Sequence, residues 1–307
     1  MDILLGFLEA TVRISVPLTL AAIGGLVAER AGVFNIGLEG MMLAGAFAGV
    51  LCAAASGSPW LGLLAASGIG ALLGMLLGLL CVKLDGNQIV VGIMLNVLIL
   101  GLTSILFRTL FGLDGQTGAA PRLPVIAIPF LSDIPIVGRV LFTQDALTYI
   151  TFILIPVMTV MLFHTPFGIR LRAAGDQPFA LDAAGVSVTK MRYIALAISG
   201  VCAALGGAHL TLVQLSFFTD GMTQGRGFVA LAAVIFGKWH PVGACVAALL
   251  FASADAFQLR LQAAGVNLPY QLLGTLPYIV TIAALAGFMG RASPPSYVGK
   301  PFIKEAN

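Results

Sequence analysis

Long apolar runs are the feature of this sequence that most restricts the folds available to it. A helix needs about 20 apolar residues to cross the roughly 30 Å hydrocarbon layer of a bilayer, and its backbone polar groups must be satisfied within the segment. Several runs meet this condition, and only 9% of the residues are charged, too few for an ordinary water-facing surface. We therefore predict an all-α fold, a polytopic transmembrane helical bundle.

Charged residues, prolines and glycines divide the apolar sequence into about nine spans, within a range of about eight to ten. One long run is interrupted at Gly237–Pro241, which predicts a broken pair of helices there. The predicted spans are Ala10–Ala28, Leu38–Ala55, Trp60–Val82, Ile89–Phe107, Tyr149–Phe163, Tyr193–Val213, Phe228–Phe236, Val242–Leu259 and Tyr270–Met289.

Lys and Arg predict the orientation, because cytosolic loops of membrane proteins are enriched in both. An external N-terminus and a cytosolic C-terminus give the larger cytosolic excess. The spans on either side of the central one then run in opposite senses, which predicts an inverted repeat. The single membrane domain divides into a first half (1–110), an external loop (111–148), a central helix (149–164), a cytosolic loop (165–192), a second half (193–290) and a cytosolic tail (291–307). The basic residues placed inside are Arg30, Lys83, Arg170, Arg172, Lys190, Arg192, Lys238, Arg291, Lys300 and Lys304, against Arg108, Arg122, Arg139, Arg226 and Arg260 outside.

The cytosolic loop contains the signals of a short helix. Asp176 or Gln177 can cap its start, Pro178 suits its first turn, and Gly185 suits its end. A helix of about seven residues does not persist alone in water. Its apolar side chains therefore need a surface, either another subunit or the underside of this bundle, and docking on a partner is the favoured interpretation. The side chains concerned are Phe179, Leu181, Ala183 and Ala184.

Polar residues interrupt the first two spans between Glu29 and Gly40. In one interpretation this is a broken helix along a solute path, with Asn35 and Glu39 offering hydrogen bonds. In the other it is a cytosolic turn in which Glu39 caps the next helix. Asn87 and Asn96, at the start of the fourth span and within it, can line a pathway or bond between helices.

The external loop, Gly112–Asp145, has prolines that exclude a continuous span and more apolar residues than an ordinary solvated loop. One hypothesis makes it a lid or a landing surface for a soluble substrate-binding protein. The alternative is an interfacial segment that only covers the bundle.

Several sequence motifs that are typical of catalytic or metal-binding sites are missing. No GxxxxGK[ST] phosphate loop is present, so we expect the chain not to hydrolyse ATP itself. The histidines, His164, His209 and His240, are far apart and form no HExxH motif, and the four cysteines have no CxxC spacing. We therefore predict no catalytic residue, no metal site and no cofactor in this chain.

Three stretches resemble the permeases of ABC importers for nucleosides, within a wider family that also serves simple sugars and branched-chain amino acids. They are Glu29–Gly49, Gly168–Arg192 and Gly225–Ala244, and the last is the most specific to the nucleoside branch. The resemblance covers essentially the whole chain. It implies a permease subunit that moves nucleosides by alternating access. An ABC permease for sugars or branched-chain amino acids is the nearest alternative, and a secondary transporter acting alone is a more distant one.

The resemblance also implies partners and a location. A separate ATP-binding subunit would carry ATP and Mg, a second, homologous permease would complete the pathway, and an external lipoprotein would deliver substrate. The chain would lie in the bacterial cytoplasmic (inner) membrane. The net charge of only +3 and the scattered Lys and Arg residues indicate no nucleic-acid partner.

Residues of the family's coupling loop, which seats in the ATPase, correspond here to Gly168, Arg170, Arg172, Gly175, Asp176, Ala183 and Gly185, and the short helix adds Phe179. The family's broken element near the pathway corresponds to Asn35–Gly40. The predicted pathway residues are Asn35, Glu39, Asn87 and Asn96.

Overall fold

The computed structural model describes residues 2–112, 120–132, 134, 137–263, 275, 279 and 293–302. Seven helices in these residues are long and apolar enough to cross a membrane. The prediction of a polytopic helical bundle is confirmed. The last predicted span, Tyr270–Met289, lies outside the described residues apart from residues 275 and 279.

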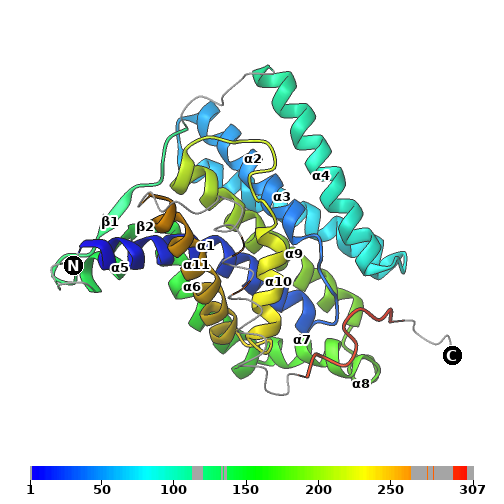
Figure 1. Cartoon of the computed structure of the whole chain (residues 1–307). Coiled ribbons are helices and arrows are strands. Elements are labelled where there is room, and N and C mark those ends of the chain that lie inside the picture. The colour runs from blue at the N-terminus through cyan, green and yellow to red at the C-terminus, as the bar shows by residue number, and fades with distance from the viewer. Residues whose placement is uncertain are drawn as a thin grey trace.

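The first four spans follow one another with short connections (Figure 1). Asn87 accepts hydrogen bonds from the backbone N–H groups of Ile89 and Val90, so the fourth helix begins where a side-chain cap is available. These elements are α1 (Asp2–Arg30), α2 (Leu38–Ser56), α3 (Pro59–Gly78), its π-helical continuation η1 (Leu79–Lys83) and α4 (Gln88–Phe111).

The second part of the chain contains the central span, two short helices and the later spans. Asp145, Thr165 and Ser187 cap the starts of α6, α7 and α9 with their side chains. The helices are α5 (Val137–Leu141), α6 (Ala146–His164), α7 (Pro166–Asp176), α8 (Pro178–Ala183), α9 (Val188–His209) with its π-helical continuation η2 (Leu210–Leu215), α10 (Arg226–Phe236) and α11 (Pro241–Ala263).

The loop predicted to be external departs slightly from an all-α description. Two three-residue strands, β1 (Val125–Ala127) and β2 (Thr143–Asp145), pair antiparallel, with Val125 opposite Asp145. The short helix α5 lies between them in the chain. As its prolines predict, the described part of this loop contains no membrane-length helix.

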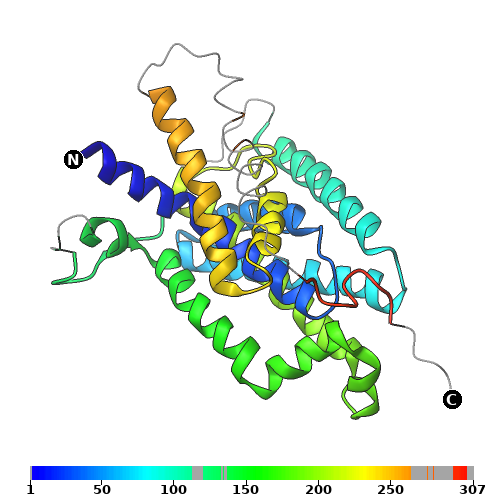
Figure 2. The ribbon, with the colours of Figure 1, turned by 60° about the horizontal axis from the view of Figure 1, so that its bottom comes forward.

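Helix α9 lies among α1, α2 and α3 and forms the centre of the bundle. Small residues permit this close packing: a Cβ atom on Gly70 would lie 2.3 Å from the carbonyl oxygen of Gly200. Burial differs strongly between helices, since 89% of the apolar window of α1 is buried but only 22% of that of α4. Helix α4 therefore stands at the periphery, as Figure 2 shows.

The loop predicted to be cytosolic, residues 165–192, is more helical than its sequence predicted. Ser187 accepts a hydrogen bond from the backbone N–H of Lys190, so α9 begins at Val188 and not at Tyr193. Arg192 consequently lies within α9, where it is 1% exposed. The predicted interruption after α10 is confirmed, because α10 ends at Phe236 and α11 begins at Pro241.

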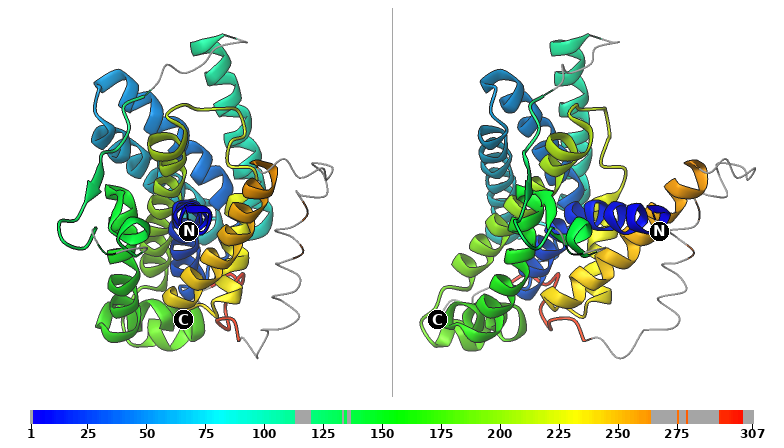
Figure 3. Two further views of the ribbon diagram at one scale, coloured as in Figure 1. Left: turned by 60° about the vertical axis from the view of Figure 1, so that its left-hand side comes forward. Right: turned by 90° about the vertical axis from the view of Figure 1, so that its left-hand side faces the viewer.

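The molecule has two contrasting ends. Helices α7 and α8 gather at one end with residues 293–302, and we call this the α7–α8 end (Figure 3). The start of α1, the end of α11 and the strands β1 and β2 meet at the other, around a hollow described below. We call it the pocket end.

Candidate functional site: the coupling helices, the broken segment and an arginine pocket

Helices α7 and α8 form the predicted coupling element. The short helix is confirmed: α8 covers Pro178–Ala183, with Gly185 beyond its end at φ +79°. Gln177 holds the N-cap position, but the predicted cap is wrong in one respect, because no side chain makes a capping hydrogen bond there. Its apolar side chains have two different surroundings. Leu181 is 7% exposed and packs with Ala174 and Val188 of the same chain, whereas Phe179 is 50% exposed. The helix therefore uses the underside of its own bundle and still presents an aromatic ring outward.

The predicted coupling residues are spread over both helices and their ends. Gly168 and Gly175 are buried at close helix contacts, Arg172 and Asp176 are partly buried, and Arg170, Phe179, Ala183 and Gly185 are exposed. At Gly175 a Cβ atom would lie 2.3 Å from the carbonyl oxygen of Arg30. The end of α7 thus touches the end of α1 through backbone atoms.

An aromatic ring links four segments at this end. The guanidinium carbons of Arg172 and Arg30 lie 4.9 Å and 5.5 Å from the centre of the Phe163 ring, and the His240 ring stacks on it at 5.0 Å. Arg30 Nε also donates to the carbonyl oxygen of Trp239 at 2.9 Å. Helix α7, predicted to couple to the ATPase, is therefore connected to α1, α6 and the turn before α11.

Sequence reasoning missed Phe163 and Trp239 as members of this joint. Trp239 has a positive φ of 53° and donates through Nε1 to Glu29. A signal was available, since Trp239 stands in the Gly- and Pro-bounded break that the sequence marked. Phe163 gave none, because an aromatic residue in an apolar span is typical of any membrane helix.

Polar side chains of helix α4 hold the segment between α1 and α2. Gln88 Oε1 accepts from the N–H of Phe34 at 2.7 Å. Asn96 donates to the carbonyl of Ile36 at 2.9 Å and accepts from the N–H of Gly40 at 2.7 Å. These bonds satisfy backbone groups that the interrupted helix leaves free.

Asn35 is fully buried and donates to the hydroxyl of Ser199 on α9 at 2.9 Å. Three of the predicted pathway residues, Asn35, Glu39 and Asn96, thus belong to one region around the break. Asn87 does not, since it is exposed and caps the start of α4. The membership of all four in a solute pathway stays a prediction.

Glu39 is a helix cap, but for a helix far along the chain. Its carboxylate accepts hydrogen bonds from the N–H of Gly225 at 2.8 Å, the N–H of Gly227 at 2.7 Å and the hydroxyl of Thr223. An anion at a helix N-terminus is favoured by the free N–H groups and the helix dipole. Glu39 therefore joins α2 to the start of α10, a contact that local capping rules did not predict.

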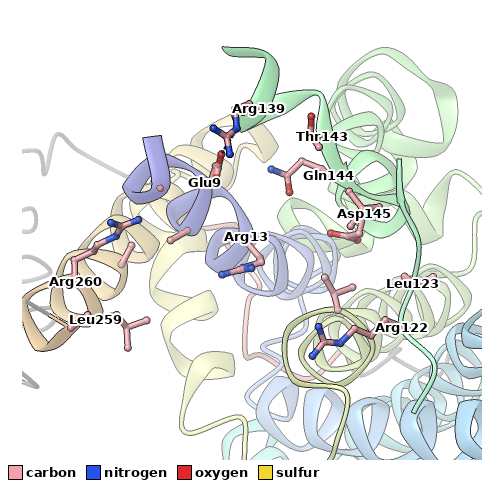
Figure 4. A pocket seen from close by; sticks show the side chains of 16 residues that line it. Glu9, Arg13, Arg122, Leu123, Arg139, Thr143, Gln144, Asp145, Leu259 and Arg260 are labelled. Atoms are coloured by element: carbon pink, nitrogen blue, oxygen red, sulfur yellow. Dashed lines mark ion pairs between the residues drawn. The ribbon is translucent and has the colours of Figure 1, made fainter. Parts of the chain in front are cut away.

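A hollow of about 670 Å³ opens at the pocket end. Its polar lining is rich in arginine and comes from α1, the loop predicted to be external and α11, as Figure 4 shows. Glu9 pairs with Arg139 at 3.6 Å, and Arg122 donates to the hydroxyl of Ser216. Among the described residues, the lining guanidinium groups without an acidic partner are those of Arg13, Arg122 and Arg260.

One acid in the wall of this hollow is already engaged. Asp145 Oδ2 lies 3.5 Å from His209 Nε2 and accepts a hydrogen bond from the Thr148 hydroxyl at 2.6 Å. Burial alone would raise the pKa of Asp145, but His209 and the Thr148 bonds outweigh it and lower the pKa to about 2. This carboxylate is therefore fixed as part of the wall.

The comparisons with known proteins agree with this architecture. The family described as "Branched-chain amino acid transport system / permease component" matches residues 7–289. The chain belongs to this permease family. The permease is 41% identical over 96% of its length to the Guanosine ABC transporter permease protein NupQ of Bacillus subtilis, of which 95% is covered.

Two further relatives of the permease are named for two different solutes, glucose and nucleosides. The Putative glucose ABC transporter permease protein TsgC13 of Haloferax volcanii is 38% identical, with 92% of this chain and 91% of that protein covered. The Nucleoside ABC transporter permease protein NupC of Lactococcus lactis is 37% identical, with 94% of each chain covered. No solved structure matches the permease.

Proposed function

We propose that the chain is the permease subunit of an ATP-driven importer for nucleosides. The observation that carries the proposal is the 41% identity to a guanosine permease over nearly the whole of both chains. A second nucleoside permease at 37% identity supports the same cargo, while the 38% identity to a putative glucose permease keeps a sugar as the competing cargo.

The proposed machine divides its chemistry among subunits. A separate ATP-binding subunit carries ATP and Mg, a second permease completes the pathway, and an external lipoprotein delivers the solute. The support within this chain is the pair α7–α8, whose Phe179 is half exposed and whose end lies against α1. We propose that α7–α8 is the surface on which the ATP-binding subunit docks.

In the proposed mechanism, a movement of α7–α8 is transmitted into the bundle. ATP binding by the partner subunit displaces the docked helices α7 and α8, and the contact of Arg172 with the Phe163 ring transmits this displacement to α1 and to the turn before α11. The break between α1 and α2 lies directly after Arg30, and Glu39 connects it to α10. We propose that the solute path runs along this break, which Asn35, Glu39 and Asn96 hold in shape.

The proposed orientation in the inner membrane places α7–α8 in the cytosol and the N-terminus outside. Arg30, Arg172 and Lys300 lie at the α7–α8 end, which agrees with the enrichment of basic residues on the cytosolic side. The pocket end then faces outward. We propose that its arginines receive acidic side chains of the substrate-binding lipoprotein.

Transport assays test the energy source and the cargo. In vesicles with all subunits, uptake should require ATP and stop with vanadate, whereas uptake driven by an ion gradient alone would identify a secondary transporter. A ligand screen on the binding protein tests the cargo. Tight binding of a sugar, with no response to any nucleoside, would replace the proposed substrate.

Phe179→Asp tests the docking surface. A charge on the half-exposed ring position should abolish ATP-dependent uptake while the permease remains in the membrane. Phe179→Tyr is the matched control, because it keeps an uncharged aromatic ring at this position. Undiminished uptake by the aspartate variant would remove α8 from the docking surface.

A further inference from the structure

Residues 293–302, here called the C-terminal strap, lie across α7 and α8. The N–H of Tyr297 donates to the carbonyl of Gly175 at 2.9 Å, and the N–H of Ser296 donates to Asp176 Oδ1 at 3.4 Å. The Phe179 ring contacts the Tyr297 ring at 5.9 Å and the Phe302 ring at 5.2 Å. The strap thus caps the end of α7 and supplies both ring neighbours of Phe179 among the described residues.

The same strap reaches the central helix of the bundle. Arg192 on α9 is 1% exposed, and its Nη1 donates to the carbonyl of Lys300 at 3.3 Å. Its Nε and Nη2 have no hydrogen-bond partner among the described residues. A buried guanidinium is costly without acceptors, so the strap carbonyl is an important partner for it.

Phe302 gives the strap an apolar anchor. It packs against the cluster of Ala174, Leu181 and Val188, which contains one residue from each of α7, α8 and α9. These three helices therefore meet beneath one aromatic side chain of the strap. Because α8 has only six residues, it has little stability of its own and depends on such contacts.

We propose that the C-terminal strap is a positioning element for coupling. It ties α8 to α7 and α9 and fixes the Phe179 ring in the orientation that meets the ATP-binding subunit. This inference rests on the proposed docking function of α7–α8. With the strap in place, a displacement of α8 is passed to the centre of the bundle; without it, α8 moves by itself and ATP is hydrolysed with little transport.

The first test measures solute moved per ATP hydrolysed in vesicles containing the complete transporter. The variant Tyr297→Ala with Phe302→Ala removes both ring contacts of Phe179 and should lower this ratio at least about tenfold, as ATP hydrolysis continues. Ser296→Ala is the matched control, because among the described residues Ser296 contacts α7 through its backbone N–H, which alanine keeps. An unchanged ratio in the double variant would overturn the inference.

A second test separates the strap from the docking surface itself. A photoreactive amino acid replaces Ala184, which is exposed at the end of α8, and cross-linking to the ATP-binding subunit is measured. A chain ending at Ala292 lacks the strap, so its cross-linking yield should differ from that of the full chain and its transport should be poor. A chain ending at Phe302 keeps the strap and should match the full chain in both cross-linking yield and transport. Absence of any cross-link in the full chain would refute the docking proposal. Equal cross-linking and equal transport by both truncated chains would refute the strap inference alone.

Discussion

The arginines at the α7–α8 end and those at the pocket end differ in the contacts that their side chains make. At the α7–α8 end, Arg30 bonds to the Trp239 carbonyl, Arg172 lies on the Phe163 ring, and Arg192 bonds to the strap. At the pocket end, several guanidinium groups line an open hollow without acidic partners among the described residues. The three guanidinium groups of the first end contact a carbonyl or a ring of another segment, whereas at the second end those of Arg13 and Arg260 have neither a hydrogen bond nor an ion pair among the described residues. This difference fits force transmission at one end and reception of a partner at the other.

The largest expected effect breaks the joint at the α7–α8 end. In Gly175→Ala the new Cβ would lie 2.3 Å from the carbonyl oxygen of Arg30 and 2.8 Å from the N–H nitrogen of Gly32. Both are backbone atoms, so α7 must move away from α1, and uptake should fall about a hundredfold. Gly68→Ala is the control, because nothing lies within 4 Å of its added Cβ. Native uptake by Gly175→Ala would show that this contact does not transmit force.

The next effect concerns the engaged carboxylate at the pocket end. Because the pKa of Asp145 in the folded protein is about 2, below its ordinary 3.8, ionised Asp145 stabilises the fold. The stability lost in Asp145→Asn should be about 2 kcal/mol at neutral pH. It should shrink as the pH falls through about 4 and vanish near pH 2, as the native carboxylate gains its proton. Thermal unfolding in detergent measures this difference.

Glu9→Gln provides the contrast for that measurement. Its carboxylate pairs with Arg139 at 3.6 Å, and 37% of its side chain is exposed. A pair in water contributes at most about 1 kcal/mol. A loss of stability as large in Glu9→Gln as in Asp145→Asn would mean that the buried carboxylate in the pocket wall stabilises the fold no more than the partly exposed Glu9–Arg139 pair does.

A smaller effect, on partner binding, is expected from reversing the charge of the pocket arginines that lack an acidic partner among the described residues. Reversing Arg13 and Arg260 to Glu should weaken binding of the substrate-binding protein about tenfold at low salt, with a smaller effect at high salt. Arg108→Glu is the control, since Arg108 is exposed and pairs with Asp220 outside the pocket. Titration of labelled binding protein against permease in nanodiscs gives both affinities. Equal weakening by the control variant would remove the special role of the pocket.

The smallest effect tests the aromatic ring of the joint. Phe163→Leu removes the ring beneath Arg30 and Arg172 and should lower the free energy of unfolding by about 1 kcal/mol. Phe163→Tyr keeps the ring and should remain near the native value. A leucine variant as stable as the native chain would show that the two guanidinium groups are held by their other contacts.

Local signals in the sequence were sufficient for much of the fold. Apolar runs located the membrane helices, and Pro and Gly located the break at Gly237–Pro241. Pro178 and Gly185 bounded the short helix α8. These features depend on neighbours in the chain, because helix length, caps and breaks are set within a few residues.

Only the tertiary structure decided which distant groups complete the candidate sites. Glu39 caps a helix that begins almost two hundred positions later, Gln88 and Asn96 support the break after α1, and Arg192 is buried beneath the strap. Each polar side chain in a membrane bundle has several possible hydrogen-bond partners, and the residues next to it in the chain do not determine which one it binds. The packing of α4 and α10 against α2, and of the strap against α9, makes that choice, because it brings each of these side chains next to a backbone group that has no partner within its own helix.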